Sequence, residues 1–143
     1  MSTTWILVAS RDEARVFSRQ GAELTLTLEI DVGNPAGRLK NSDIDSDRAG
    51  RSTDNRMHAR HAYSSEVEPR DHLLHAFYTE TLNTLRLAYI QGRFDDLVVV
   101  AEPRLLGVIR QRLPEMLREV VTREIPKDLS FASPQQLATR VQR

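Results

Sequence analysis

Residues 5–9 read Trp-Ile-Leu-Val-Ala, and residues 97–101 read Leu-Val-Val-Val-Ala. Each stretch is a short, continuously apolar run, which is typical of a strand buried on both faces of a sheet. Strands of this kind are usually parallel and central in an α/β domain. The two stretches therefore predict neighbouring, parallel strands in the middle of the fold.

Two more strands are expected soon after the first, at residues 14–19 and 23–31. In the second of them leucine and isoleucine alternate with polar residues, so one face is expected to carry Leu24, Leu26, Leu28 and Ile30. This alternation predicts an antiparallel outer strand. With the first strand it forms a three-stranded meander.

A helix is expected to open at Glu68-Pro69, because proline is tolerated in the first turn of a helix. Apolar residues then recur at steps of three and four from Leu74 to Tyr89, and Gly92 is placed to close the helix.

Three further elements follow the second apolar strand. Glu102-Pro103 is expected to start a helix that Pro114 interrupts or ends, and residues 119–125 are expected to form a strand. Ser133-Pro134 opens a last helix, with Gln136 at the capping-box position.

The element order is therefore βββαβαβα in a single α/β domain of residues 1–143, with an irregular loop at about 33–68 between the third strand and the first helix. Right-handed crossovers arrange a mixed five-stranded sheet in the order 3-2-1-4-5, a ribonuclease-H-like topology. A ligand site is expected where the strand order switches, at the carboxyl ends of strands one and four. The residues expected there are Ser10, Arg11, Asp12, Glu102 and Arg104.

The overall composition narrows the classes of function. Twenty Lys and Arg balance twenty Asp and Glu, so any basic binding site must be local. Without cysteine the chain has no disulfide framework, thiol nucleophile or cysteine-ligated metal. No basic leader and no apolar stretch of membrane-spanning length is present, which predicts a soluble, cytoplasmic protein with no membrane partner.

The long loop contains the clearest local charge pattern, beginning with residues 45–52, Asp-Ser-Asp-Arg-Ala-Gly-Arg-Ser. From 48 to 61 only Asp54 opposes a group of arginines and histidines, namely Arg48, Arg51, Arg56, Arg60, His58 and His61. The planar guanidinium donates two parallel hydrogen bonds to phosphate, so the loop suits an RNA or ribosomal contact. A solvated loop without a partner remains the open alternative.

Other motifs favour structural roles. His72 and His75 share a helix face, yet they lack the further ligand that a metal site needs, and no cofactor motif is present. The stretch Gly-Asn-Pro-Ala-Gly-Arg at 33–38 lacks the ending of a phosphate-binding loop and is expected to form a turn. Lys127-Asp128 is expected to hold the last loop.

Asp12 and Glu102 occupy positions where nucleases of this topology hold metal ions. A two-metal site needs several convergent carboxylates, and the first strand contains none. Arg11 and Arg104 are expected to pair with these two acids instead, so a metal-dependent nuclease is the least favoured alternative.

The segments WILVASRDEARVF, GNPAGR, DSDRAGRS, GRFDDLVVVAEPRLLGVIR and EIPKDLS together resemble the bacterial family named "protein required for attachment to host cells". The resemblance covers nearly the whole chain and extends to bacterial relatives of the middle domain of archaeo-eukaryotic release factors. It implies a link to the ribosome, tRNA or rRNA, and a role in adhesion that is direct or indirect.

In release factors the middle domain carries a Gly-Gly-Gln tip, and residues 48–52 occupy its place here. Gly50 is kept, but Ala49 replaces one glycine and Arg51 stands where glutamine would be. The resemblance therefore implies RNA contact through Arg48, Gly50, Arg51, Arg56 and Arg60 without hydrolysis of peptidyl-tRNA. A protein-interaction module or regulator is the second hypothesis.

Overall fold

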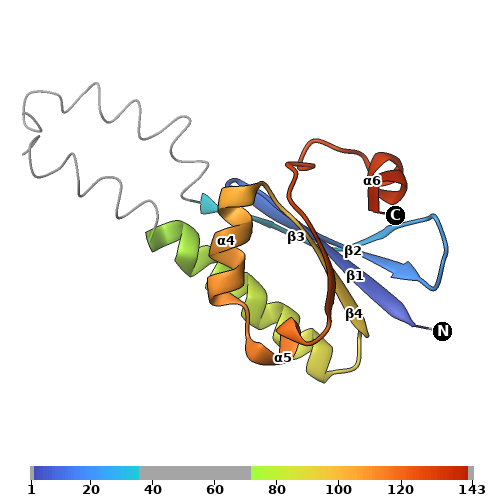
Figure 1. Ribbon diagram of the computed structural model, residues 1–143, viewed down its shortest axis with the longest axis horizontal. Coiled ribbons are helices and arrows are strands. Elements are labelled where there is room, and N and C mark those ends of the chain that lie inside the picture. The colour runs from blue at the N-terminus through green and yellow to red at the C-terminus, as the bar shows by residue number, and fades with distance from the viewer. Residues whose placement is uncertain (1, 36–71, 142–143) are drawn as a thin grey trace, which may run out of the picture.

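The computed structural model describes residues 2–35 and 72–141 (Figure 1). Its strands are β1 (Thr3–Ala9), β2 (Glu13–Gln20), β3 (Thr27–Gly33), β4 (Asp96–Val100) and β5 (Val121–Ile125). Its helices are α4 (Pro103–Arg112), α5 (Glu115–Arg118), α6 (Pro134–Val141) and an unlabelled helix of residues 72–90. The expected start of that helix at Glu68-Pro69 lies outside the described residues.

The five strands form one sheet in the order β3-β2-β1-β4-β5, which confirms the predicted order. β1 pairs with β4 in parallel, as the two apolar runs predicted, and Ile6 stands opposite Val98. β2 and β3 complete the antiparallel meander, while β5 extends the other edge in parallel. The ribonuclease-H-like α/β topology is therefore correct.

Helices cover both faces of the sheet (Figure 1). On one face Trp5 and Leu7 of β1 belong to the same core as the helix of residues 72–90, α4 and α5. On the other face Ile6 and Val8 pack in a core with α6. Successive side chains of a strand point to opposite faces, so a strand between two helical layers must be apolar throughout.

The predicted single apolar face of the third strand is wrong. The pairing of β2 with β3 shifts register, because Val16 lies opposite Ile30 while Phe17 lies opposite Leu28. Glu29 is therefore the extra residue of a β-bulge, which places Leu28 and Ile30 on opposite faces. Leu28 is consequently 51% exposed, whereas Ile30 packs against the core.

The segment after α4 also differs from the expectation. Pro114 ends α4 as predicted, but it also precedes the single turn of α5, and the strand begins at Val121 rather than at residue 119. Val98 lies opposite Arg123 and Leu97 opposite Val121, so Thr122 is the extra residue of a second bulge. Such bulges are common at sheet edges, where β5 lies.

Two helix ends have the hydrogen bonds that their sequences predicted. Gly92 has a φ of 76°, and the N–H groups of Gly92 and Arg93 donate to the carbonyls of Tyr89 and Ala88, which is a Schellman motif. At the start of α6 the Ser133 N–H donates to Gln136 Oε1 at 2.8 Å. The Gln136 N–H donates to Ser133 Oγ at 3.2 Å, completing a capping box.

Candidate functional site

The turn that joins β1 to β2 stands at the switch point where a ligand site was expected. Ser10 holds this turn, because its Oγ donates to the Glu13 carbonyl at 3.0 Å and accepts from the N–H groups of Asp12 and Glu13. The Ser10 N–H donates to the same Glu13 carbonyl at 2.9 Å. The Ser10 hydroxyl is thus used to fix the backbone.

Tyr78 connects this turn to the helix of residues 72–90. Its hydroxyl donates to the Ser10 carbonyl at 2.5 Å and accepts from the Ser10 N–H at 3.0 Å. The side chain is fully buried, and burial raises the pKa of the phenol well above its usual 10.0, so the group remains a neutral donor. The sequence placed Tyr78 on the core face of the helix but gave no indication of the hydroxyl's partner.

Asn34 precedes residues 36–71, which lie outside the described residues, and it is held at the same turn. Its N–H donates to the Asp12 carbonyl at 2.7 Å, and its Nδ2 donates to the Arg11 carbonyl at 2.8 Å. Asn34 is buried, as a polar group with hydrogen-bond partners can be. The turn of residues 10–13 therefore binds Asn34, which precedes residues 36–71, and Tyr78, which lies in the second turn of the helix that follows them.

The charged residues of the switch point do not form the ion pairs that were expected. Among the described residues the recorded ion pairs are Arg93–Glu29 and Arg110–Glu124, and neither includes Asp12 or Glu102. Glu102 is the N-cap residue of α4, but its side chain makes no capping hydrogen bond. Residues 2–35 and 72–141 contain no group of three His, Asp or Glu side chains that could hold a metal ion.

A hollow of about 570 Å³ lies where both flanks of the undescribed segment approach each other. Asn34 and Pro35 line it from one side, and His72 and His75 line it from the helix together with Arg112 of α4. The Arg112 Nε–H donates to His75 Nδ1 at 2.9 Å. Nδ1 is therefore the hydrogen-bond acceptor of this pair.

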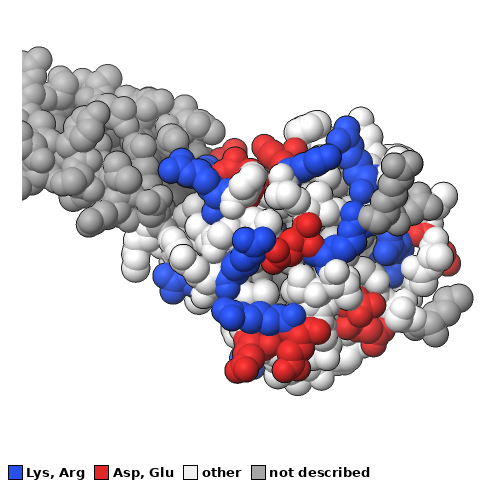
Figure 2. Space-filling view, in the orientation of Figure 1, with Lys and Arg blue, Asp and Glu red and all other residues white. Residues whose placement is uncertain are grey.

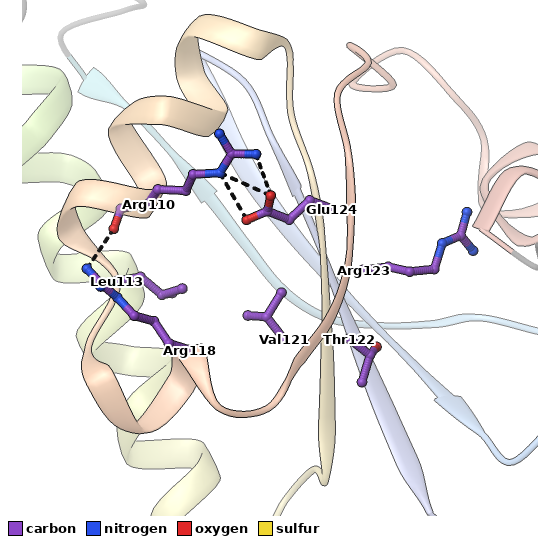
Figure 3. Close-up of a pocket in the computed structure, with 7 residues that line it drawn as sticks. All are labelled: Arg110, Leu113, Arg118, Val121, Thr122, Arg123 and Glu124. Carbon is purple, nitrogen blue, oxygen red and sulfur yellow. Dashed lines mark hydrogen bonds and ion pairs between the residues drawn. The ribbon is translucent and has the colours of Figure 1, made fainter.

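A second hollow of about 570 Å³ borders the edge strand β5 (Figure 3). Arg110 of α4 reaches over it to Glu124, with Nε at 3.0 Å from Oε1 and 3.2 Å from Oε2. This hydrogen-bonded pair raises the pKa of Arg110 and lowers that of Glu124. The bulge at Thr122 explains why Val121 and Glu124 both face α4 in Figure 3.

Arg118 and Arg123 use guanidinium groups to bind helix ends beside this second hollow. Arg118 Nη2 donates to the Arg110 carbonyl near the end of α4 at 3.0 Å (Figure 3). Arg123 Nη1 donates to the Val141 carbonyl at the end of α6 at 2.8 Å. Both contacts stabilise carbonyls that have no partner within their own helix.

The last loop is held by a residue that the sequence did not single out. Arg15 Nη2 donates to the Ser130 carbonyl at 2.7 Å and to those of Leu129 and Ala132 at 3.4 and 3.3 Å. Asp128 Oδ1 accepts from the N–H and hydroxyl of Ser130, a structural role of the kind expected for Lys127-Asp128. The only available signal for Arg15 was a cation within a mainly buried strand.

The residues predicted to contact RNA, Arg48, Gly50, Arg51, Arg56 and Arg60, lie outside the described residues, as do His58 and His61. On the face of the described domain shown in Figure 2, basic and acidic side chains are interspersed. This face has no continuous basic surface of the kind that tracks a nucleic-acid backbone. None of the described helices has the length and apolar character needed to cross a membrane.

Comparison with known proteins gives a family match over most of the chain. The profile of the family described as "Protein required for attachment to host cells" matches residues 5–141. An uncharacterized protein of Rickettsia prowazekii is 46% identical over 39 residues, which make up 27% of this chain and 26% of that protein. The chain therefore aligns with only about a quarter of that relative's length.

Proposed function

This chain belongs to the family of proteins required for attachment to host cells, and from its geometry we propose that it is a non-enzymatic, cytoplasmic RNA-binding protein. The α/β domain is the rigid base, and the segment of residues 36–71 supplies the arginines that contact phosphate groups. The partner is ribosomal or transfer RNA, and any effect on attachment to host cells is indirect.

The observation that carries this proposal is the common anchor of the segment's two flanks. Asn34 donates hydrogen bonds to the carbonyls of Arg11 and Asp12. The Tyr78 hydroxyl donates a hydrogen bond to the carbonyl of Ser10. Both flanks thus leave the domain at one end of the sheet, close to the hollow that Asn34 and His72 line. A segment attached in this way resembles the long binding loops that rigid scaffolds present to their partners.

The charges of the segment point to phosphate as the ligand. Between residues 48 and 61 the sequence contains a single acid, Asp54. The same stretch contains four arginines, namely Arg48, Arg51, Arg56 and Arg60. Guanidinium groups bind phosphate in a bidentate manner, and such contacts give affinity without reading a base sequence. The resemblance of the sequence to release-factor middle domains is a second support for an RNA partner.

A binding role also fits the state of the polar groups at the switch point. The Ser10 hydroxyl and the Tyr78 hydroxyl are both engaged with backbone groups of the turn. In the segment itself, Arg51 replaces the glutamine that positions water in release factors. Both hydroxyls therefore have structural roles.

The test measures sedimentation of the protein with ribosomes and with RNA over a range of salt concentrations. If four phosphates are neutralised, the slope of log affinity against log salt is expected to be roughly −3 to −4. Each single change, such as Arg48→Ala or Arg56→Ala, is expected to reduce that slope by about one.

Arg140→Ala is the matched control, because Arg140 is an exposed arginine of α6 on the described domain. This change is expected to leave the slope unaltered. If the fourfold arginine variant keeps its fold and still associates with RNA at full affinity, the segment is not the contact surface.

A protein partner is the second candidate, and the hollow beside β5 favours it. This hollow lies beside the edge strand β5 and has Leu113 and Val121 as apolar lining. Recovery of a stoichiometric protein complex that resists high salt and contains no RNA would support this alternative over the first.

A further inference from the structure

The helix of residues 72–90 carries an unusual set of side chains on its outward face. Its inward face is buried in the core through Leu74, Tyr78, Leu82 and Leu85. The opposite face carries an exposed stripe, which consists of Leu73, Ala76, Glu80, Asn83, Leu87 and Ile90. Leu73, Leu87 and Ile90 are 48, 46 and 55% exposed, so large apolar side chains stand at both ends of this outward stripe.

The spacing of the outward stripe is that of a helix-pairing surface. Its members follow one another at steps of three, four, three, four and three residues, the a and d positions of a heptad repeat. A helix of this length is about 28 Å long, so the stripe offers several successive layers to a second helix. In Figure 1 the helix (green to yellow) runs along one side of the described domain. Leu73, Ala76 and Glu80 also line the hollow that Arg112 of α4 borders, while the exposure of Leu87 and Ile90 leaves the other end of the stripe open.

We propose that the outward stripe is a dimer interface, and that its occupant is the same helix of a second copy of this chain, packed antiparallel. A two-fold axis between Thr81 and Leu82 places Leu73 opposite Ile90 of the partner subunit. It also places Ala76 opposite the partner's Leu87, and Glu80 opposite the partner's Asn83. Every apolar member of the stripe then meets an apolar member.

The polar centre of the stripe selects this orientation. In a parallel pair the two Glu80 carboxylates would face each other, and like charges at such a position destabilise the pair. In the antiparallel pair each Glu80 faces an Asn83 amide. Arg86 Nε already donates to Asn83 Oδ1 at 3.1 Å, which leaves the Asn83 Nδ2 donor to face a carboxylate.

Neither recorded ion pair of the described residues involves Glu80, so its carboxylate is available for this contact. Arg86 lies about one turn beyond Asn83, which faces the partner's Glu80, so its guanidinium approaches that carboxylate in the antiparallel arrangement. Polar residues at the centre of a helix pair fix register and orientation at some cost in affinity. The dimer is therefore expected to be weak and dependent on concentration.

The other exposed apolar residues offer no comparable surface. Leu28 and Val32 lie in the edge strand β3, with Leu24 shortly before it, and Met116 is the exposed apolar residue of the short helix α5. Phe131 lies in the loop before α6. At the opposite edge β5 contains the bulge at Thr122, and bulges protect an edge from pairing with another strand. Isolated apolar side chains are normal on protein surfaces, whereas a heptad-spaced set is not.

The test is sedimentation equilibrium of the full chain from about 1 to about 300 µM, a range that spans weak association. The mass is expected to rise from that of a 16.3 kDa monomer toward twice that value. Leu87→Glu is expected to weaken association by at least about tenfold, because each dimer contains the buried charge twice. Leu24→Glu introduces the same change at an exposed leucine outside the stripe and is expected to leave association unaltered.

Cysteine substitutions test the orientation, because the native chain contains no cysteine. A mixture of the Ala76→Cys and Leu87→Cys proteins is expected to form a disulfide between unlike copies, since those positions meet in the antiparallel pair. Ala76→Cys alone is expected to cross-link poorly. A monomer at every concentration, loss of the dimer in Leu24→Glu rather than Leu87→Glu, or efficient cross-linking of Ala76→Cys to itself would overturn the proposal.

Discussion

At the scale of single residues, removal of the Tyr78 hydroxyl is expected to destabilise the fold measurably. Tyr78→Phe keeps the buried ring but deprives the Ser10 carbonyl of its donor. Because a buried carbonyl without a partner carries a desolvation penalty, the free energy of unfolding is expected to fall by about 1–3 kcal/mol. Urea unfolding measures this change.

Tyr89→Phe is the control for this substitution, because it removes the same hydroxyl from a half-buried tyrosine of the same helix. No hydrogen bond of the Tyr89 hydroxyl is recorded among the described residues, so its change in unfolding free energy is expected within about 0.5 kcal/mol. Equal losses in the two variants would show that the Ser10 contact adds nothing to stability.

The sequence predicted where Ser10, Asp12 and Glu102 lie but not what they contact. Their positions follow from the ends of two apolar strands, which a local pattern reveals. The partner of Ser10 is Tyr78, 68 residues away, and that of Arg15 is Ser130, 115 residues away. Contacts between residues so far apart in the sequence depend on how the helices pack against the sheet. The spacing of neighbouring residues does not predict that packing.

At the scale of elements, two glycines in comparable open space are expected to respond oppositely to alanine. Gly92 has a φ of 76°, and no atom lies within 4 Å of an added Cβ, so the cost of Gly92→Ala comes from the backbone alone. An L-residue in the left-handed region is disfavoured, and a loss of about 1 kcal/mol in unfolding free energy is expected.

Gly107 provides the matched comparison because it lies inside α4 and has equally open space around an added Cβ. Alanine has the higher helix propensity, so Gly107→Ala is expected to gain about 0.5–1 kcal/mol. Thermal unfolding of both variants under one set of conditions compares them. A stabilising Gly92→Ala would contradict the role of the Schellman motif in ending the helix.

The strand order could be predicted because β1 and β4 are apolar on both faces, and only a central position satisfies such strands. The bulges at Glu29 and Thr122 could not be predicted. A bulge depends on which residues the neighbouring strand offers, and the alternation of Leu24, Leu26, Leu28 and Ile30 described an unbroken strand. The actual strand turns Leu28 away from the face that contains Ile30.

At the scale of the whole molecule, the described residues form two cores, one on each face of the sheet. Trp5, Leu7 and Leu85 belong to the core on one face of the sheet, and Ile6 and Leu137 to that on the other. The fold is therefore expected to be independent of residues 36–71, and RNA binding is expected to depend on them.

Replacing residues 36–71 with a Gly/Ser linker of about eight residues tests this separation, because Pro35 and His72 line one hollow and a linker of that length spans up to about 25 Å. A shorter loop loses less conformational entropy when its ends are brought together on folding. The free energy of unfolding is therefore expected to rise by about 1 kcal/mol. Urea unfolding measures that rise, and sedimentation with RNA is expected to show no salt-sensitive association.

The decisive comparison is with the fourfold arginine variant, which keeps the segment but loses its cations. If the shortened chain fails to fold while the arginine variant folds normally, residues 36–71 contribute to the stability of the fold, and the expected independence of the domain is wrong.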